Sequence, residues 1–150
     1  MQIRTIVVPI DFSPSAEDAK QWAIDLARRY GASLILAHVV PPVAWPASPD
    51  GLMLTPTDLA ASTRGELESS LGQTCAAIRE EGVPARPALL DGTPAQEIAA
   101  LARRADADLI VMGTHGRKGV SHALLGSVAE KVLRTAPCPV FTVRMREDAR

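Results

Sequence analysis

The chain has 150 residues, enough for a single domain with one substantial core, and we treat residues 1–150 as that domain. Hydrophobic residues make up 47% of the sequence and charged residues 22%, the balance of a soluble globular protein. Sixteen basic and seventeen acidic side chains nearly cancel, which argues against a general nucleic-acid binder because such proteins carry a basic surplus.

An apolar, β-branched run at Ile3–Ile10 opens the chain and predicts a strand that is buried on both faces. The run is too short for a signal-peptide core or a membrane span, so we expect a cytoplasmic protein without membrane attachment. Ser13 or Ser15 then offers an N-cap beside Pro14. Apolar residues recur at helical spacing from there to Gly31, namely Ala16, Ala19, Trp22, Ala23, Leu26, Ala27 and Tyr30.

A second strand is expected at Ser33–Val40. The segment Pro41–Pro56 carries five prolines without a clean period, which predicts a long irregular loop. A second helix ends at Gly82, and its apolar positions are Leu59, Thr63, Leu67, Leu71 and Ile78.

The third predicted strand, Val83–Leu90, is interrupted by two prolines, which places it at a sheet edge. Thr93-Pro94-Ala95-Gln96 matches a capping box with proline at the first helical position, so a short helix should begin there. The remaining elements are a strand at Leu109–Met112, a helix opening at Ser127–Leu133 and a strand at Val140–Val143.

Strands and helices thus alternate along the chain. This order predicts an α/β fold of Rossmann-like type, an open and mainly parallel five-stranded sheet with helices on both faces and right-handed crossovers. Ligands of such sheets bind beyond the carboxyl ends of the strands, where successive connections run in opposite directions. The ends marked by Asp11 and by Gly113 are the two candidates for that position.

A glycine-rich stretch follows the fourth strand. It begins with Gly113-Thr114-His115-Gly116 and closes with Gly126-Ser127 at the start of the last helix. Glycines leave no Cβ between backbone N–H groups and an approaching phosphate, and a helix start adds further N–H groups and a favourable dipole. Arg117 and Lys118 could add positive charge. The competing interpretation is a tight turn that only connects two elements.

The spacing G-x2-G-x9-G-S resembles the universal stress protein family, in its ATP-binding subclass. The resemblance also rests on "VVPIDFSPSA", "LILAHVV" and "APCPVFTV", and it covers Ile3–Val143 apart from the Pro41–Pro56 loop. It implies a sheet of order 3-2-1-4-5, an adenine nucleotide as ligand, a role in stress response and a homodimer formed through Val140–Val143. P-loop and GxGxxG patterns are missing from the sequence.

The resemblance also implies a role for each matched residue. Asp11 would bind the ribose, Pro9, Val39 and Met112 would frame the adenine, and the glycine stretch would surround the phosphates. The complete nucleotide-binding set is Pro9, Ile10, Asp11, Val39, Met112, Gly113, His115, Gly116, Arg117, Gly126, Ser127 and Val128. ATP, or AMP or ADP, would bind with Mg²⁺ held mainly by the phosphates, because only Asp11 offers a nearby carboxylate.

Several alternatives stay open. Asp11 could be a helix cap, Val39 and Met112 are core-type residues whatever binds beside them, and His38 suits a buried structural histidine. We expect no catalytic residues, since neither a Ser-His-Asp set nor paired carboxylates can be recognised in the glycine stretch. A slow ATPase or nucleotidyl-transfer enzyme using His115 and Asp11 is the alternative, and a flavoprotein-like binder is a third. The two cysteines, at positions 75 and 138, are expected to be reduced and packed.

Overall fold

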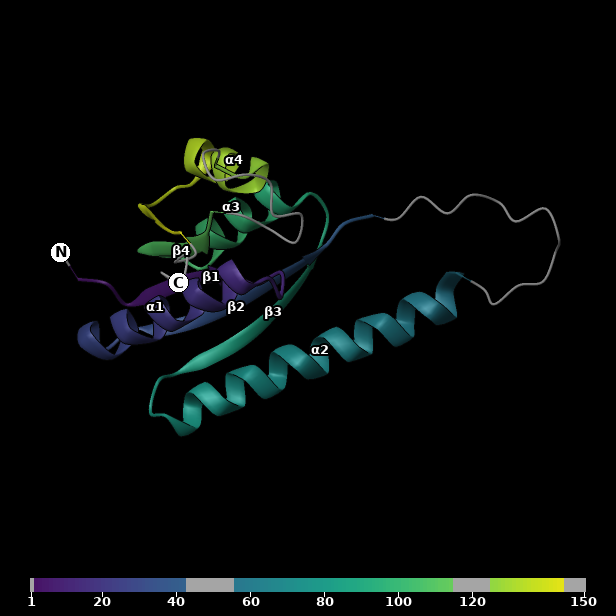
Figure 1. The fold of residues 1–150 in the computed structure, drawn as a ribbon, viewed down its shortest axis with the longest axis horizontal. Helices are drawn as coiled ribbons and strands as arrows, with labels where there is room; N and C mark the ends of the chain where they lie inside the picture. Colours follow the sequence, from purple (N-terminus) through teal and green to yellow (C-terminus); the bar gives the residue numbers. More distant parts are fainter. Residues whose placement is uncertain (1, 43–55, 115–124, 145–150) are drawn as a thin grey trace, which may run out of the picture.

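The computed structural model describes residues 2–42, 56–114 and 125–144. Strands and helices alternate through them as the sequence predicts (Figure 1). The elements are β1 (Thr5–Pro9), α1 (Pro14–Tyr30), β2 (Ser33–Val40), α2 (Pro56–Glu80), β3 (Ala85–Asp91), α3 (Pro94–Arg104), β4 (Leu109–Gly113), α4 (Ser127–Thr135) and β5 (Val140–Val143).

The five strands form one sheet of order β3-β2-β1-β4-β5, and every neighbouring pair is parallel. This confirms both the fold class and the strand order. In the centre, Val7 of β1 lies opposite Ile35 of β2 and Ile110 of β4. After β1 the chain forms β2 and then β3 on one side of β1, and it later forms β4 and β5 on the other side of β1. The point where the connections diverge therefore lies between the carboxyl ends of β1 and β4.

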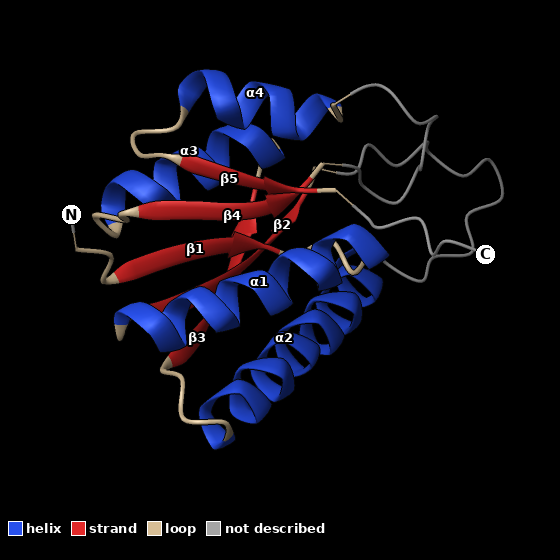
Figure 2. Cartoon of the chain, turned by 60° about the vertical axis from the view of Figure 1, so that its left-hand side comes forward, coloured by secondary structure: helices blue, strands red, loops and turns tan. Residues whose placement is uncertain are grey.

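The helices cover the sheet in two layers (Figure 2). α1 and α2 pack on one face, where residues such as Ile6, Leu36 and Leu71 form a core cluster. α3 and α4 pack on the other face against a second cluster that includes Ile35 and Val132. Residues of the central strands alternate between the two clusters and are almost fully buried. Their burial on both faces explains why these strands consist of near-continuous apolar runs.

The edge strands differ from the centre. β3 lies at one edge as predicted. Pro87 is within the strand and Pro84 just before it, and a residue without an N–H costs least where one side of the strand has no partner. β5 forms the other edge, and its Phe141 is 39% exposed. Among the described helices, none combines the length and the apolar character that crossing a membrane requires.

Helix α1 begins and ends as expected. Ser13 is its N-cap and accepts a hydrogen bond from the Ala16 N–H, while Gly31 closes the helix in the left-handed conformation at φ +68°. The expected apolar stripe is too wide, however. Trp22 and Tyr30 are about half exposed, because small residues such as Ala19 and Ala23 make the close contact with the sheet and leave the aromatic rings at its rim.

The capping box predicted at the start of α3 is wrong. Thr93 is the N-cap residue, but its side chain makes no capping hydrogen bond. Thr93 is exposed, so water can accept hydrogen bonds from the N–H groups of the first turn in place of the threonine side chain.

Candidate functional site

The turn between β1 and α1 is held by the Asp11 carboxylate. Its Oδ1 accepts hydrogen bonds from the Ser13 backbone N–H at 2.9 Å and from the Ser13 hydroxyl at 2.5 Å. The same hydroxyl accepts the Ala16 N–H at 3.3 Å as the helix cap. Ser13, and not Asp11, therefore caps α1, which removes one of the competing interpretations of Asp11. Ser13 is only 5% exposed, so water competes little for these bonds.

Phe12 lies between these two residues in an unusual conformation. Its φ is +62°, a region that costs a bulky side chain roughly 1–2 kcal/mol. Its ring packs against the His38 ring with centroids 5.1 Å apart. The His38 Nδ1 lies 2.6 Å from the Ile10 carbonyl oxygen, and a carbonyl can only accept, so Nδ1 carries the proton. His38 is thus the buried structural histidine that the sequence suggests.

Gly113 ends β4 directly against the N-terminus of α1. A Cβ built at this glycine would lie 2.6 Å from the Ser15 Oγ and 2.7 Å from the Ser15 carbonyl oxygen, closer than real Cβ atoms come. Glycine is required at this position because the backbone at the start of α1 occupies the space that a side chain would need. The sequence suggested a ligand or a tight connecting turn as the reason for an absent side chain at Gly113, and packing against α1 is a third reason that suffices by itself.

Thr114 joins the ends of β4, β5 and α4. Its N–H donates to the Val143 carbonyl oxygen at 3.0 Å, and its own carbonyl accepts the Gly126 N–H at 2.7 Å. This second bond brings Gly126, the N-cap of α4, to the end of β4. Sequence reasoning gave Thr114 no role, and only its place between two glycines could have drawn attention to it.

The first residues of α4 lie at this end of the sheet as predicted. Gly126 has φ −62° and ψ 150°, which any L-residue can adopt, so conformation alone does not require glycine there. Ser127 is the first helical residue, and Val128 is 36% exposed. His115, Gly116 and Arg117 lie outside the described residues.

The predicted adenine-framing residues lie on one side of the sheet. Val39 and Met112 belong to the core cluster under α3 and α4, and Pro9 shares that face with Val7 by the alternation of β1. β2 and β4 flank β1, so Val39 and Met112 stand on either side of its end. Both are at least nine-tenths buried. Ile10 faces the opposite cluster, under α1 and α2.

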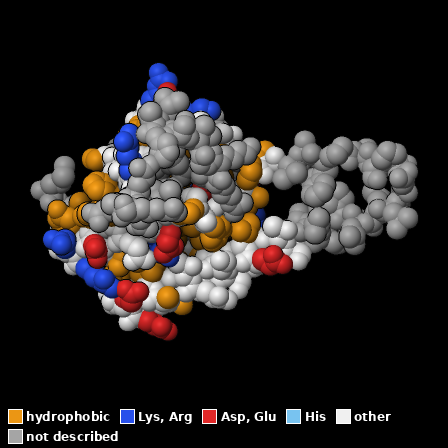
Figure 3. Space-filling model, viewed as in Figure 1, with side chains coloured by type: hydrophobic (Ala, Val, Ile, Leu, Met, Phe, Trp, Pro, Cys, Tyr) orange, Lys and Arg blue, Asp and Glu red, His pale blue; other side chains and the backbone are white. Residues whose placement is uncertain are grey.

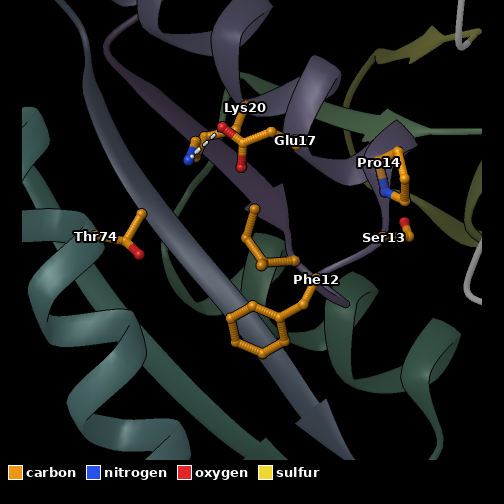
Figure 4. Close-up of a pocket in the computed structure, with 7 residues that line it drawn as sticks. Phe12, Ser13, Pro14, Glu17, Lys20 and Thr74 are labelled. Carbon is orange, nitrogen blue, oxygen red and sulfur yellow. Dashed lines mark ion pairs between the residues drawn. The ribbon is translucent and has the colours of Figure 1, made fainter.

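A pocket of about 290 Å³ opens on that opposite side, between α1, α2 and the β1–α1 turn (Figure 4). Thr74 of α2 and Phe12 of the β1–α1 turn both line it, and a 2.7 Å ion pair joins Glu17 to Lys20. Burial raises the pKa of Glu17, but hydrogen bonds from Lys20 and Gln21 and the charge of Lys20 lower it below its ordinary value. The pocket is thus separated by the sheet from Val39 and Met112.

Charge is mixed on the face drawn in Figure 3. Acidic and basic side chains lie among one another on the lower left of the face in Figure 3. Arg28 of α1, for example, pairs with Asp25 and with Glu81. Within the described residues, no group of three or more His, Cys, Asp or Glu side chains is placed to hold a metal ion. Both cysteines there are free thiols, and burial raises the pKa of each.

Comparison with known proteins agrees with this architecture. The family model described as "Universal stress protein family" matches residues 2–144. A universal stress protein of Thermus aquaticus is 39% identical over 142 residues, which is 94% of this chain and 98% of that protein. The solved structure of UspA from Lactobacillus plantarum superposes with a TM-score of 0.81 at 26% identity, covering 96% of this chain and 99% of that one.

A further solved structure carries a ligand. It is the universal stress protein from Archaeoglobus fulgidus in complex with dAMP, with a TM-score of 0.65 at 26% identity, and the match covers 95% of this chain and 98% of that one. The family match spans nearly the whole chain, and the fold agrees with that of the superposed structures. This chain belongs to the universal stress protein family.

Proposed function

We propose that this protein binds an adenine nucleotide, ATP in the first instance, beyond the carboxyl ends of β1 and β4. One observation carries the proposal: the hydrogen bond from Gly126 to Thr114 brings a glycine-capped helix start to the end of β4. That end adjoins β1, so the N-terminus of α4 faces the point where ligands bind in open α/β sheets. The dAMP complex of the Archaeoglobus fulgidus relative supports the choice of an adenine nucleotide.

The residues present suit the parts of such a ligand. The N–H groups in the first turn of α4, which have no acceptor within the helix itself, and the helix dipole suit the phosphates, with the Ser127 hydroxyl beside them. Val39 and Met112 flank the end of β1, so a flat base bound there would lie next to apolar residues that are themselves almost fully buried. Asp11 supplies the carboxylate for the ribose. Mg²⁺ would be held mainly by the phosphates, because only Asp11 offers a nearby carboxylate.

The function that follows is nucleotide-dependent regulation in a stress response. The bound nucleotide would alter a surface that a partner or a second copy of the chain contacts. β5 is the strand we propose for pairing two copies. It is an edge strand, and Phe141 lies on it beside Trp22 of α1, with ring centroids 5.8 Å apart and both rings partly exposed. Such an edge attracts other strands unless it is covered.

Nucleotide binding at this position is tested by adding a small side chain at Gly126. In Gly126→Ser the backbone conformation and the helix cap are kept, because serine is a favoured N-cap residue, but a side chain enters the space proposed for the phosphates. Isothermal titration with ATP·Mg²⁺ should then show affinity about tenfold lower or worse, at an unchanged melting temperature. Gly65→Ala, in α2, is the control, since its Cβ would meet nothing within 4 Å.

Measurements on the wild-type protein test whether it binds an adenine nucleotide at all. A ligand at a hundred times its dissociation constant adds about 2.7 kcal/mol to the stability of the native state, so millimolar ATP should raise the melting temperature clearly. Mass spectrometry of the supernatant after denaturation would identify any nucleotide that copurifies. If the wild type shows neither binding heat nor a melting shift with ATP or AMP, the proposal is wrong.

A further inference from the structure

We propose that Ser13 is a positioning residue, which holds the Asp11 carboxylate in the orientation needed to bind the ribose hydroxyls of the nucleotide. The inference rests on the proposed function and adds to it a residue outside the predicted nucleotide-binding set. It starts from two hydrogen bonds to one atom: the Ser13 N–H and the Ser13 hydroxyl both donate to Asp11 Oδ1, at 2.9 and 2.5 Å.

The hydroxyl of Ser13 has two functions at once. It donates to Asp11, and it accepts the Ala16 N–H as the cap of α1. A carboxylate at position 13 could cap the helix but could not donate to Asp11. A hydroxyl can do both, which gives a physical reason for serine or threonine at this position. The orientation of Asp11 is thereby tied to the first turn of α1.

The rest of the turn prevents this arrangement from relaxing. Phe12, between the two residues, has φ +62° and packs against His38, whose Nδ1 donates to the Ile10 carbonyl. The chain before Asp11 and the chain after it are therefore both anchored. A carboxylate fixed in this way loses little conformational freedom when a ligand binds, so more of its hydrogen-bond energy contributes to affinity.

The test compares two nucleotides and five proteins, namely the wild type, three single variants and one double variant. ATP·Mg²⁺ and 2′,3′-dideoxy-ATP·Mg²⁺ differ only in the ribose hydroxyls. In Ser13→Gly the N–H bond to Asp11 and most of the capping energy remain, but the hydroxyl is gone. We expect Ser13→Gly to bind ATP roughly three- to tenfold more weakly than the wild type, with dideoxy-ATP affinity unchanged within twofold. Ser13→Thr keeps a hydroxyl and should restore ATP binding.

Two further measurements separate positioning from simple stability. Melting curves of each variant show whether the fold is kept. Asp11→Ala should remove the preference for ATP over dideoxy-ATP, and adding Ser13→Gly to it should cause no further loss, because the serine acts through the carboxylate.

Each failure has a separate meaning. Equal weakening of both nucleotides by Ser13→Gly indicates a structural role only and overturns the inference. A wild type that binds the two nucleotides equally also overturns it, while the proposed nucleotide-binding function stands. A wild type that binds neither nucleotide refutes the proposed function, and the inference with it.

Discussion

Replacing Gly113 with alanine should destabilise the protein, because the new methyl group would collide with Ser15, which is distant in sequence but adjacent in the fold. The new methyl group would lie 2.6–2.8 Å from the Oγ, O and carbonyl C atoms of Ser15. Two of these are backbone atoms at the start of α1, so the conflict cannot be relieved by rotating a side chain alone. Overpacking of this kind costs about 1–3 kcal/mol, which for a domain of this size lowers the melting temperature by roughly 2–12 °C.

Thermal unfolding followed by circular dichroism measures the effect directly. Gly65→Ala is the matched control, because the same methyl group is added inside α2 with nothing within 4 Å, and alanine is favoured over glycine in a helix by about 0.5–1 kcal/mol. The two substitutions should thus shift the melting temperature in opposite directions. A Gly113→Ala protein that melts with the wild type would show that β4 and α1 are not packed as tightly as described.

Two other predictions concern the chain terminus and the sheet edge. The Asp108 carboxylate accepts the N–H groups of Arg4 and Thr5 at 2.8 and 3.0 Å, and these bonds lower its pKa. Because the folded-state pKa is below that of the unfolded chain, the stabilisation is complete above the unfolded-state pKa and is lost as pH falls through the folded-state value. Asp108→Asn should therefore lower stability in urea at neutral pH and lessen its decline toward about pH 3, and an identical pH dependence would contradict this. Phe141→Arg at the β5 edge should convert the proposed dimer to monomer in light scattering, with an unchanged circular dichroism spectrum, whereas a monomeric wild type would refute the dimer.

The fold was predictable because its signals are local. Central strands buried on two faces consist of apolar runs, and helix ends carry the residues that their backbone geometry favours, such as Ser13 and Gly31. The position of β3 at an edge followed from its prolines. The strand order came from the family resemblance, since periodicity alone does not determine which strands become neighbours.

The two local predictions that were wrong, the burial of Trp22 and the capping by Thr93, failed for a shared physical reason. Helical spacing placed Trp22 on the buried face of α1, but the small size of the neighbouring alanines lets the helix approach the sheet and leaves the ring at the rim. At the exposed start of α3, water competes with the Thr93 side chain for the backbone N–H groups, and a sequence pattern does not show how exposed a helix start is. In both cases the outcome depends on how closely elements pack or how far they are solvated, and neither is encoded in residue spacing.

Gly113 shows how the site and the fold constrain one another. Its missing side chain lets the start of α1 approach the end of β4, and that start carries Ser13, which holds Asp11. Thr114, the next residue, brings Gly126 and the start of α4 to the same end of the sheet. A single strand end thus sets the positions of two helix N-termini, one beside the carboxylate and one beside the proposed phosphate site. We therefore expect substitutions at Gly113 to affect nucleotide affinity and stability together, whereas Gly126→Ser should affect affinity alone, because the Gly126 conformation is open to any residue.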